Sequence, residues 1–356
     1  MFAASTMSFL FKRSDKSRMP DEVINKVIVD LNKLPGMAAG STRDKLIEHI
    51  SKYLAMARAH LFGSLEENKQ PTTATVDGFT QAIAGSQFGV LLIRNIAELD
   101  FEARKDGAQV LGAAIRHQVG DAFPAAEMAA RERELIDLLI KGYEDVDIAL
   151  NVGQVLRDCL RHENVTRVIL MSPEFNRFFD LVSHPNFDVA SDAFACFRDA
   201  LTRHKALVAS YLEQYYDHFF TRFSALMKSD NYVTKRQSVK LLGEILLEPV
   251  NRPIMHRFIS NVENLKLSMI LLRDKSKNIE HEAFHVFKVI AANPYKPVAI
   301  KKILFKNQEK MIQYLEGFLA ERNEDAQFVE DKETVIARIA ELNDVNIHEE
   351  PPQSQM

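Results

Sequence analysis

Apolar residues recur at intervals of three and four along most of the chain, which is typical of helices that bury one face. The first such stripe is Ile24, Val27, Ile28, Leu31 and Leu34. Pro20 fits the first turn of this helix, where no backbone N–H is needed, and Pro35-Gly36 predicts its end. A second helix is predicted from Ser41, which forms a capping-box-like pair with Asp44, to a closing Gly63.

The helical segments repeat at an offset of forty-five residues. Phe101–His117 aligns in this way with Val146–His162, and the apolar positions of Ser238–Leu242 align with those of Ala283–Phe287. Strand-like runs of alternating β-branched residues are nearly absent from the sequence. A period of this length is typical of stacked armadillo or HEAT units. We therefore predict an all-α, armadillo/HEAT-like helical-repeat solenoid, shaped as a horseshoe and forming a single continuous domain of five or six repeats.

The ends of the chain are expected to lie outside this solenoid. Residues 1–19 are interpreted as a flexible N-terminal segment, residues 20–343 as the repeat domain and residues 344–356 as a disordered tail, because the final EEPPQSQM has no apolar periodicity. The segments Met311–Phe318 and Val329–Leu342 are predicted to be capping helices.

Composition narrows the class of protein. Of the 356 residues, 46% are hydrophobic and 26% are charged, and no apolar run approaches the ~18–20 residues that span a bilayer. The first residues do not resemble a secretory signal, since Lys12 and Arg13 follow the short apolar piece instead of preceding it. Cys159 and Cys196 lack the spacing of a zinc site and are expected to be buried thiols. These features favour a cytoplasmic protein that is monomeric by itself.

Positive charge is concentrated between Asn231 and Lys310. This stretch has 15 Lys and Arg against 7 Asp and Glu, a net charge of +8, whereas the whole chain carries −4. Its basic face comprises Lys235, Arg236, Lys240, Lys266, Lys275, Lys277 and Lys306. A solvated surface is the usual fate of such charges, but Tyr232, Met269 and Phe305 are interleaved with them as apolar anchors. We therefore expect a docking surface for an acidic protein partner and not for nucleic acid, because the net charge is negative.

Only one motif suggests catalysis. His281–His285 reads HEAFH, and on a helix the HExxH pattern places two histidines and a general-base glutamate around zinc. No third ligand follows at a suitable spacing, and the repeat register puts His281 and His285 where Arg236 and Lys240 stand one unit earlier. We interpret the two histidines as part of a surface ladder and expect no enzyme activity, cofactor or metal. A zinc hydrolase is kept as an alternative.

Arg-His pairs recur at the predicted ends of helices. They are Arg116-His117, Arg161-His162 and Arg203-His204. A cation at a helix C-terminus stabilises the helix dipole, which is a sufficient structural reason for these pairs.

Longer blocks of sequence resemble one family. The blocks are NYVTKRQSVKLLGE (Asn231–Glu244), ENLKLSMILLRDKSKNI (Glu263–Ile279), EAFHVFKV (Glu282–Val289), FDVASDAFACFRDALTRHK (Phe187–Lys205) and LLIKGYE (Leu138–Glu144). They closely resemble the calcium-binding-protein-thirty-nine family, also called mouse protein twenty-five, whose fungal relatives act in morphogenesis. The similarity extends from about Phe9 to Leu342. No calcium-binding loop corresponds to the name.

The resemblance implies a scaffold without catalytic activity that acts in signal transduction and cell polarity. Members of the family bind and activate STE-twenty-type protein kinases and the pseudokinase STRAD. A concave face holds the kinase domain, and a C-terminal pocket takes a Trp-Glu-Phe motif of the partner. The concave contact residues correspond here to Phe187, Tyr232, Arg236, Lys240 and Lys266, and the tail-pocket residues to Met269 and Lys306.

One binding alternative belongs to another class. A karyopherin-like adaptor would carry an extended peptide along ladders of Asn and Trp on successive inner helices. The chain contains no Trp, which disfavours this alternative.

Overall fold

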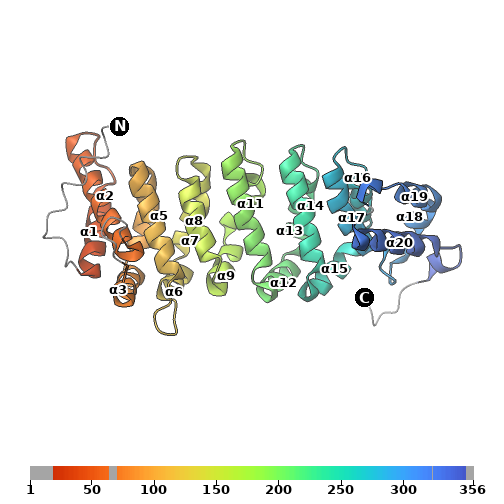
Figure 1. The fold of residues 1–356 in the computed structure, drawn as a ribbon, viewed down its shortest axis with the longest axis horizontal. Coiled ribbons are helices and arrows are strands. Elements are labelled where there is room, and N and C mark those ends of the chain that lie inside the picture. Colours follow the sequence, from red (N-terminus) through yellow and green to blue (C-terminus); the bar gives the residue numbers. More distant parts are fainter. Residues whose placement is uncertain (1–18, 64–69, 323, 350–356) are drawn as a thin grey trace. The chain divides into compact units, whose positions relative to one another are not determined.

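The computed structural model describes residues 19–63, 70–322 and 324–349, and within them it contains twenty α-helices and no β-strand (Figure 1). This confirms the all-α, helical-repeat prediction. The chain divides into two compact units, residues 1–203 and 204–356. The single continuous domain and its predicted limits stay predictions, and residues 1–18 and 350–356, which hold most of the predicted flexible ends, lie outside the described residues.

The first unit is built from helical triplets. Its helices are α1 (Pro20–Lys33), α2 (Ser41–Phe62), α3 (Thr73–Ala84), α4 (Phe88–Asn95), α5 (Phe101–Arg116), α6 (Pro124–Arg131), α7 (Arg133–Lys141), α8 (Ala149–Cys159), α9 (Glu163–Met171), α10 (Phe178–Leu181) and α11 (Phe187–Thr202), with short 3-10 helices η2 (Ile96–Glu98), η3 (Gly142–Glu144) and η4 (Pro173–Arg177). Helices α2, α5, α8 and α11 pack in succession, and α3, α6 and α9 form a second row (Figure 1). Each triplet buries its apolar stripe against the next, as an armadillo-type stack requires.

The second unit continues the same plan. Its helices are α12 (Lys205–Gln214), α13 (Tyr216–Met227), α14 (Tyr232–Leu247), α15 (Arg252–Ile259), α16 (Val262–Leu271), α17 (Lys277–Ala291), α18 (Val298–Lys306), α19 (Gln308–Glu316) and α20 (Ala326–Ala340), with η5 (Pro249–Asn251), η6 (Ala320–Arg322) and η7 (Asn346–His348). The third helices α14, α17 and α20 pack in succession. Because α14 and α17 start forty-five residues apart, the structure confirms the repeat predicted from Ser238 and Ala283.

Several helix ends agree with the sequence, and others do not. Pro20 begins α1, and Gly63 ends α2 with a φ of 84°, the left-handed region that favours glycine. Ser41 is the first helical residue and not the cap, because Gly40 precedes the helix and no side chain caps it.

Beyond the C-terminal helix, Ile347 is buried and Lys301 Nζ donates to the carbonyl oxygens of Asn346 and Glu349, 3.1 and 2.9 Å away.

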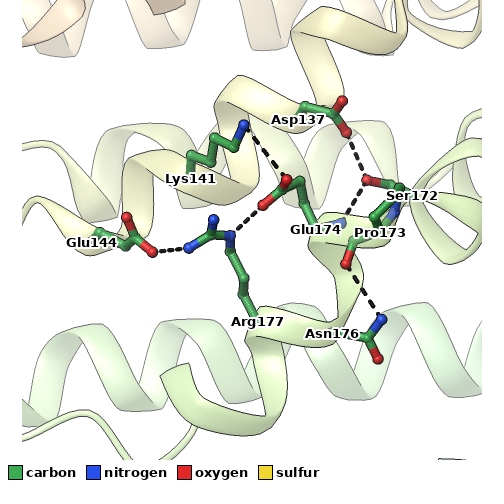
Figure 2. Close-up of polar contacts among 8 residues, drawn as sticks. All are labelled: Asp137, Lys141, Glu144, Ser172, Pro173, Glu174, Asn176 and Arg177. Atoms are coloured by element: carbon green, nitrogen blue, oxygen red, sulfur yellow. Dashed lines mark hydrogen bonds and ion pairs between the residues drawn. The ribbon is translucent and has the colours of Figure 1, made fainter. Parts of the chain in front are cut away.

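A buried aromatic cluster packs η4 and α10 against α11, and polar contacts join η4 to α7 and η3. Phe175 and Phe178 pack against Phe197 of α11 with ring centroids 5.8 and 6.0 Å apart. At the surface, Figure 2 shows Ser172 Oγ donating to Asp137 at 2.6 Å, and Glu174 accepting from Lys141 and Arg177. Arg177 also pairs with Glu144 of η3 (Figure 2). These polar contacts join η3, α7 and η4.

The two thiols are buried as predicted. Cys159 and Cys196 are both free and buried, and burial raises the pKa of each thiol above its usual range. Around Cys196, the Tyr143 hydroxyl donates to Asp192 at 2.6 Å and lies 3.1 Å from Cys196 Sγ. Arg157 completes the charge balance by pairing with Asp192. This buried network links α8, η3 and α11.

Candidate partner-binding surface

One face of α14 carries three of the predicted contact residues. The side chain of Asn231 caps this helix by accepting from the backbone N–H groups of Val233 and Thr234, at 2.9 and 3.1 Å. Tyr232, Arg236 and Lys240 follow at intervals of four, so they lie on one side of the helix. The side chains of Tyr232 and Lys240 are exposed, and that of Arg236 is half-buried.

Helix α17 fixes two of these three side chains. The Tyr232 hydroxyl accepts a hydrogen bond from Asn278 Nδ2 at 3.2 Å, and this bond lowers the pKa of Tyr232. Arg236 lies 3.6 Å from Glu282, a carboxylate that is largely buried. Lys240 forms no ion pair with any residue that the structure describes. The face therefore combines two fixed groups with one lysine that is available to a partner.

The remaining residues of the second unit come from α16 and α18. Lys266 and Met269 lie three residues apart on α16, which packs against both α17 and α18. Lys266 is exposed and pairs with Glu263 at 2.7 Å, and Met269 is half-buried. Lys306 is exposed at the last position of α18. We name Tyr232, Arg236, Lys240, Lys266, Met269 and Lys306 the candidate surface.

Phe187 belongs to the first unit and is described by itself. It is the first residue of α11, directly after the capping Asn186, and its side chain is 66% exposed. Two thirds of this residue is exposed, so its ring is available for contact with a partner.

Ion pairs within the second unit neutralise much of the basic face. Lys235 pairs with Asp274 at 3.2 Å, and both side chains are mostly buried. Lys277 pairs with Glu280 at 2.9 Å on the same helix. Together with the pairs of Arg236 and Lys266, four of the seven basic residues are matched by an acid. Among the described residues, Lys240, Lys275 and Lys306 have no such partner.

The interpretation of His281 and His285 as a surface ladder is wrong. Both side chains are half-buried, and the His281 ring packs 5.5 Å from the ring of Phe328 on α20. The repeat register was right, because the position of Arg236 on α14 recurs at His281. However, α20 covers this part of α17. Burial, as the largest cause, lowers the pKa of His281 to about 4 and also lowers that of His285.

The histidines do not assemble a metal site in the part of the chain that the structure describes. The two rings lie 4.6 Å apart, but within residues 19–63, 70–322 and 324–349 no three His, Cys, Asp or Glu side chains gather as metal ligands would. The HExxH pattern therefore brings no third described ligand with it.

The Arg-His pairs make more specific contacts than a helix dipole alone requires. Arg116 ends α5 and pairs with Asp158 of α8. His117 Nε2 lies 2.6 Å from Asp77 of α3. The Arg116–Asp158 pair joins neighbouring triplets, whereas the His117–Asp77 contact joins the first and third helices of one triplet.

Two residues of the surface escaped the sequence analysis. Glu282 is the partner of Arg236, and Asn278 is the partner of Tyr232. Both lie forty-six residues after the group they contact, one repeat and one residue further along the chain. This offset is the signal that would have predicted them.

Comparison with known proteins identifies relatives along nearly the whole chain. A family model described as Mo25-like matches residues 9–343. A Homo sapiens protein named "Calcium-binding protein 39-like" is 45% identical over 333 residues, which cover 94% of this chain and 97% of that protein. The "Mo25-like protein" of Schizosaccharomyces pombe is 40% identical over 336 residues, covering 94% of this chain and all of that protein (100%).

Solved structures with a comparable trace include a computationally designed armadillo repeat protein. It is 10% identical, has a TM-score of 0.43, and the alignment covers 76% of this chain and 99% of the designed chain.

No helix among the described residues combines the length and the apolar content that crossing a membrane requires.

Proposed function

We propose that this chain, which belongs to the Mo25-like family, binds a protein kinase and activates it allosterically. Its family membership and its helical-repeat fold both support a scaffold protein. The partner is a STE-twenty-type kinase or a STRAD-like pseudokinase. In this proposal the scaffold has no catalytic activity of its own and works in the cytoplasm, in signalling that controls cell polarity and morphogenesis. The groups that contact the kinase domain are Phe187, Tyr232, Arg236, Lys240 and Lys266.

The observation that carries this proposal is the arrangement on α14. Tyr232 and Lys240 are exposed at the two ends of a row of three, and Arg236 between them is held by Glu282 at 3.6 Å. A surface whose side chains are already fixed loses less conformational entropy on binding than a mobile one. Tyr and Arg are also among the residue types that are enriched at protein-binding hot spots. This supports binding of a folded, acidic partner surface.

The proposed mechanism of activation is selection of one kinase conformation. A scaffold shifts a kinase towards its active state only if it contacts that state more tightly than the inactive one. A tenfold shift requires about 1.4 kcal/mol of differential binding, which a single well-placed contact can supply.

A second attachment completes the proposal. Met269 is a flexible apolar side chain suited to aromatic rings, and Lys306 is suited to the carboxylate of a Trp-Glu-Phe-like tail motif. Docking of the tail raises the effective concentration of the kinase domain at the candidate surface, so both attachments strengthen the complex beyond either alone.

The test measures binding and activation of a STE-twenty-type kinase by purified variants. Lys240→Ala and Tyr232→Ala remove groups from α14, and Met269→Ala removes the proposed tail contact. Lys228→Ala is the matched control, since Lys228 is an exposed lysine of the same unit outside the candidate surface. Arg236→Ala is less informative because it leaves the buried carboxylate of Glu282 without its cation.

We expect the α14 variants to weaken binding of the isolated kinase domain by roughly tenfold each and to reduce its activation. Met269→Ala should weaken the binding only of kinases that keep their C-terminal tail. Unchanged binding and activation in all three variants would refute the site, and unchanged kinase activity with saturating wild-type scaffold would refute the function.

A further inference from the structure

Exposed apolar side chains recur at one edge of the first unit. Phe101 begins α5 and is 74% exposed, and Phe187 begins α11 and is 66% exposed. Between them, at the start of α8, Val146 and Leu150 are 48% and 49% exposed. Single exposed apolar residues are ordinary, but here one or two stand at the start of each of three successive third helices. We name these four residues the apolar edge.

The helix starts that carry the apolar edge are neighbours. Helices α5, α8 and α11 stand side by side and run in the same direction (Figure 1). Arg104 in the first turn of α5 donates to the carbonyl oxygen of Asp147, just before α8, at 3.4 Å. Packed helices lie about 8–10 Å apart, so the apolar groups form a row with a step of about 10 Å.

The surroundings of the apolar edge are acidic. Exposed carboxylates on the same helix starts are Glu98, Asp100, Glu102, Glu144, Asp145, Asp147 and Asp188. Asp145, Asp147 and Asp188 form no ion pair with any described residue. Glu98, Glu102 and Glu144 are paired with Arg43, Lys105 and Arg177, and the guanidinium of Arg104 also donates to the carbonyl oxygens of Leu99 and Ala97. Charge complementarity therefore favours a basic occupant.

The backbone at this edge selects a helix over an extended peptide. An extended peptide needs partners for its own N–H and C=O groups. Some of the N–H groups at these helix starts are already bonded, since Asp100 accepts from Ala103 N, Asn186 accepts from Asp188 N and Val189 N, and Asp145 accepts from Asp147 N. An α-helix satisfies its own backbone, and its residues at i, i+7 and i+14 repeat every 10.5 Å, close to the step of the row.

We propose that the apolar edge of the first unit is a docking site for a basic amphipathic helix of a partner protein. Its apolar residues, seven positions apart, would contact Phe101, Val146 with Leu150, and Phe187 in turn. Its flanking Lys and Arg would face the carboxylates between them. The inference adds a second partner element to the proposed scaffold function, with which it shares Phe187, and it needs none of the residues of the second unit.

The test uses the full chain and a fluorescein-labelled peptide of about 20 residues, with leucine at every seventh position, Lys or Arg beside each leucine and alanine elsewhere. Fluorescence anisotropy compares wild type with Phe101→Ser/Leu150→Ser. Both substitutions remove exposed side chains, so thermal melting should be unchanged. Val29→Ser, another exposed apolar residue of this unit, is the matched control.

We expect the double variant to bind at least ~10-fold more weakly than wild type and Val29→Ser to bind equally. A scrambled peptide of the same composition should bind ~10-fold more weakly than the designed one. Equal binding of the double variant, or of the scrambled peptide, overturns the proposal, because attraction to acidic groups would then suffice.

The peptide experiment and the kinase experiment test the two proposals independently of each other. Lys240→Ala and Met269→Ala should bind the basic peptide as wild type does, whereas Phe101→Ser/Leu150→Ser should still bind the isolated kinase domain through the second unit. Loss of peptide binding in Lys240→Ala would contradict the placement of the peptide on the first unit.

Discussion

Acid should weaken the attachment of α20 to α17, and His281 is the group that makes this measurable. Its ring packs against Phe328, and its Nε2 is buried without a hydrogen-bond partner in the described residues. The charged groups that act on it are His285 of α17, Arg322 of η6, Asp325 at the start of α20 and Arg236 of α14. Protonation would place a cation in this contact, next to a second histidine whose pKa is also lowered.

The sign and size of the effect follow from linkage. The unfolded pKa is 6.5 and the folded pKa is about 4, so the unfolded state takes up the proton first as the pH falls. Stability from this group is complete above pH 6.5 and is lost progressively between 6.5 and about 4. At pH 5 the full shift corresponds to about 2 kcal/mol, and halving it for residual solvent screening leaves about 1 kcal/mol.

The assay is urea unfolding followed by circular dichroism at pH 7.5 and pH 5, because the chain has no Trp to report by fluorescence. His281→Phe keeps an aromatic ring against Phe328 but cannot be protonated. It should lose about 1 kcal/mol less than wild type between the two pH values. His348→Gln, which removes an exposed histidine, should behave as wild type does. An identical pH dependence in wild type and His281→Phe would refute the reasoning.

Three further predictions concern the packing of the triplets. Gly153→Ala should destabilise the chain by about 1–3 kcal/mol, because its methyl group would collide with Asp192 and the Tyr143 hydroxyl. Gly243→Ala should instead stabilise the chain by about 0.5–1 kcal/mol, because the space around that position is open. Thermal melting checks both variants, and equal effects would contradict the packing described here. Tyr143→Phe should cost about 1.5 kcal/mol in urea unfolding, since the hydroxyl donates to a carboxylate, and a neutral result would show that Arg157 alone satisfies Asp192. Cys159 and Cys196 should react with a disulfide reagent only after unfolding, because both are buried and their pKa values are raised; fast reaction of the native protein would disprove their burial.

The sequence was sufficient to predict the forty-five-residue repeat but not the helix boundaries between the repeating third helices. The apolar phase at Ser238 and Ala283 predicted α14 and α17 because helix stacking constrains that phase directly. Neither Gly nor Pro stands at the break between α12 and α13 at Tyr215, and the apolar phase runs through it, so the sequence does not predict this break. Apolar periodicity does not predict the start of α3 at Thr73 either, because Thr72 caps this helix within a polar segment.

The burial of His281 shows why a repeat register predicts position and not environment. One unit earlier, Arg236 occupies the same place on α14, where it is half-buried and pairs with Glu282 of the following third helix. His281 meets α20 instead, where its ring packs against Phe328 and the acidic group that acts on it is Asp325 at the start of that helix. The environment of a repeat position depends on the next element in the stack, and the last repeats are followed by different elements from the internal ones.

The ion pairs of the second unit decide how charge can contribute to binding a partner. The pair Lys266–Glu263 joins two exposed residues of one helix, so it is worth about 0–1 kcal/mol and yields easily to a partner carboxylate. Arg236 does not yield in this way, because displacing it would leave Glu282 buried without a cation. Charge on this face therefore acts mainly through Lys240 and other exposed lysines, which accelerate encounter and orient the partner. The binding free energy then has to come mostly from the apolar groups Tyr232 and Met269. Added salt should consequently slow the association of a kinase more than it shortens the lifetime of the complex.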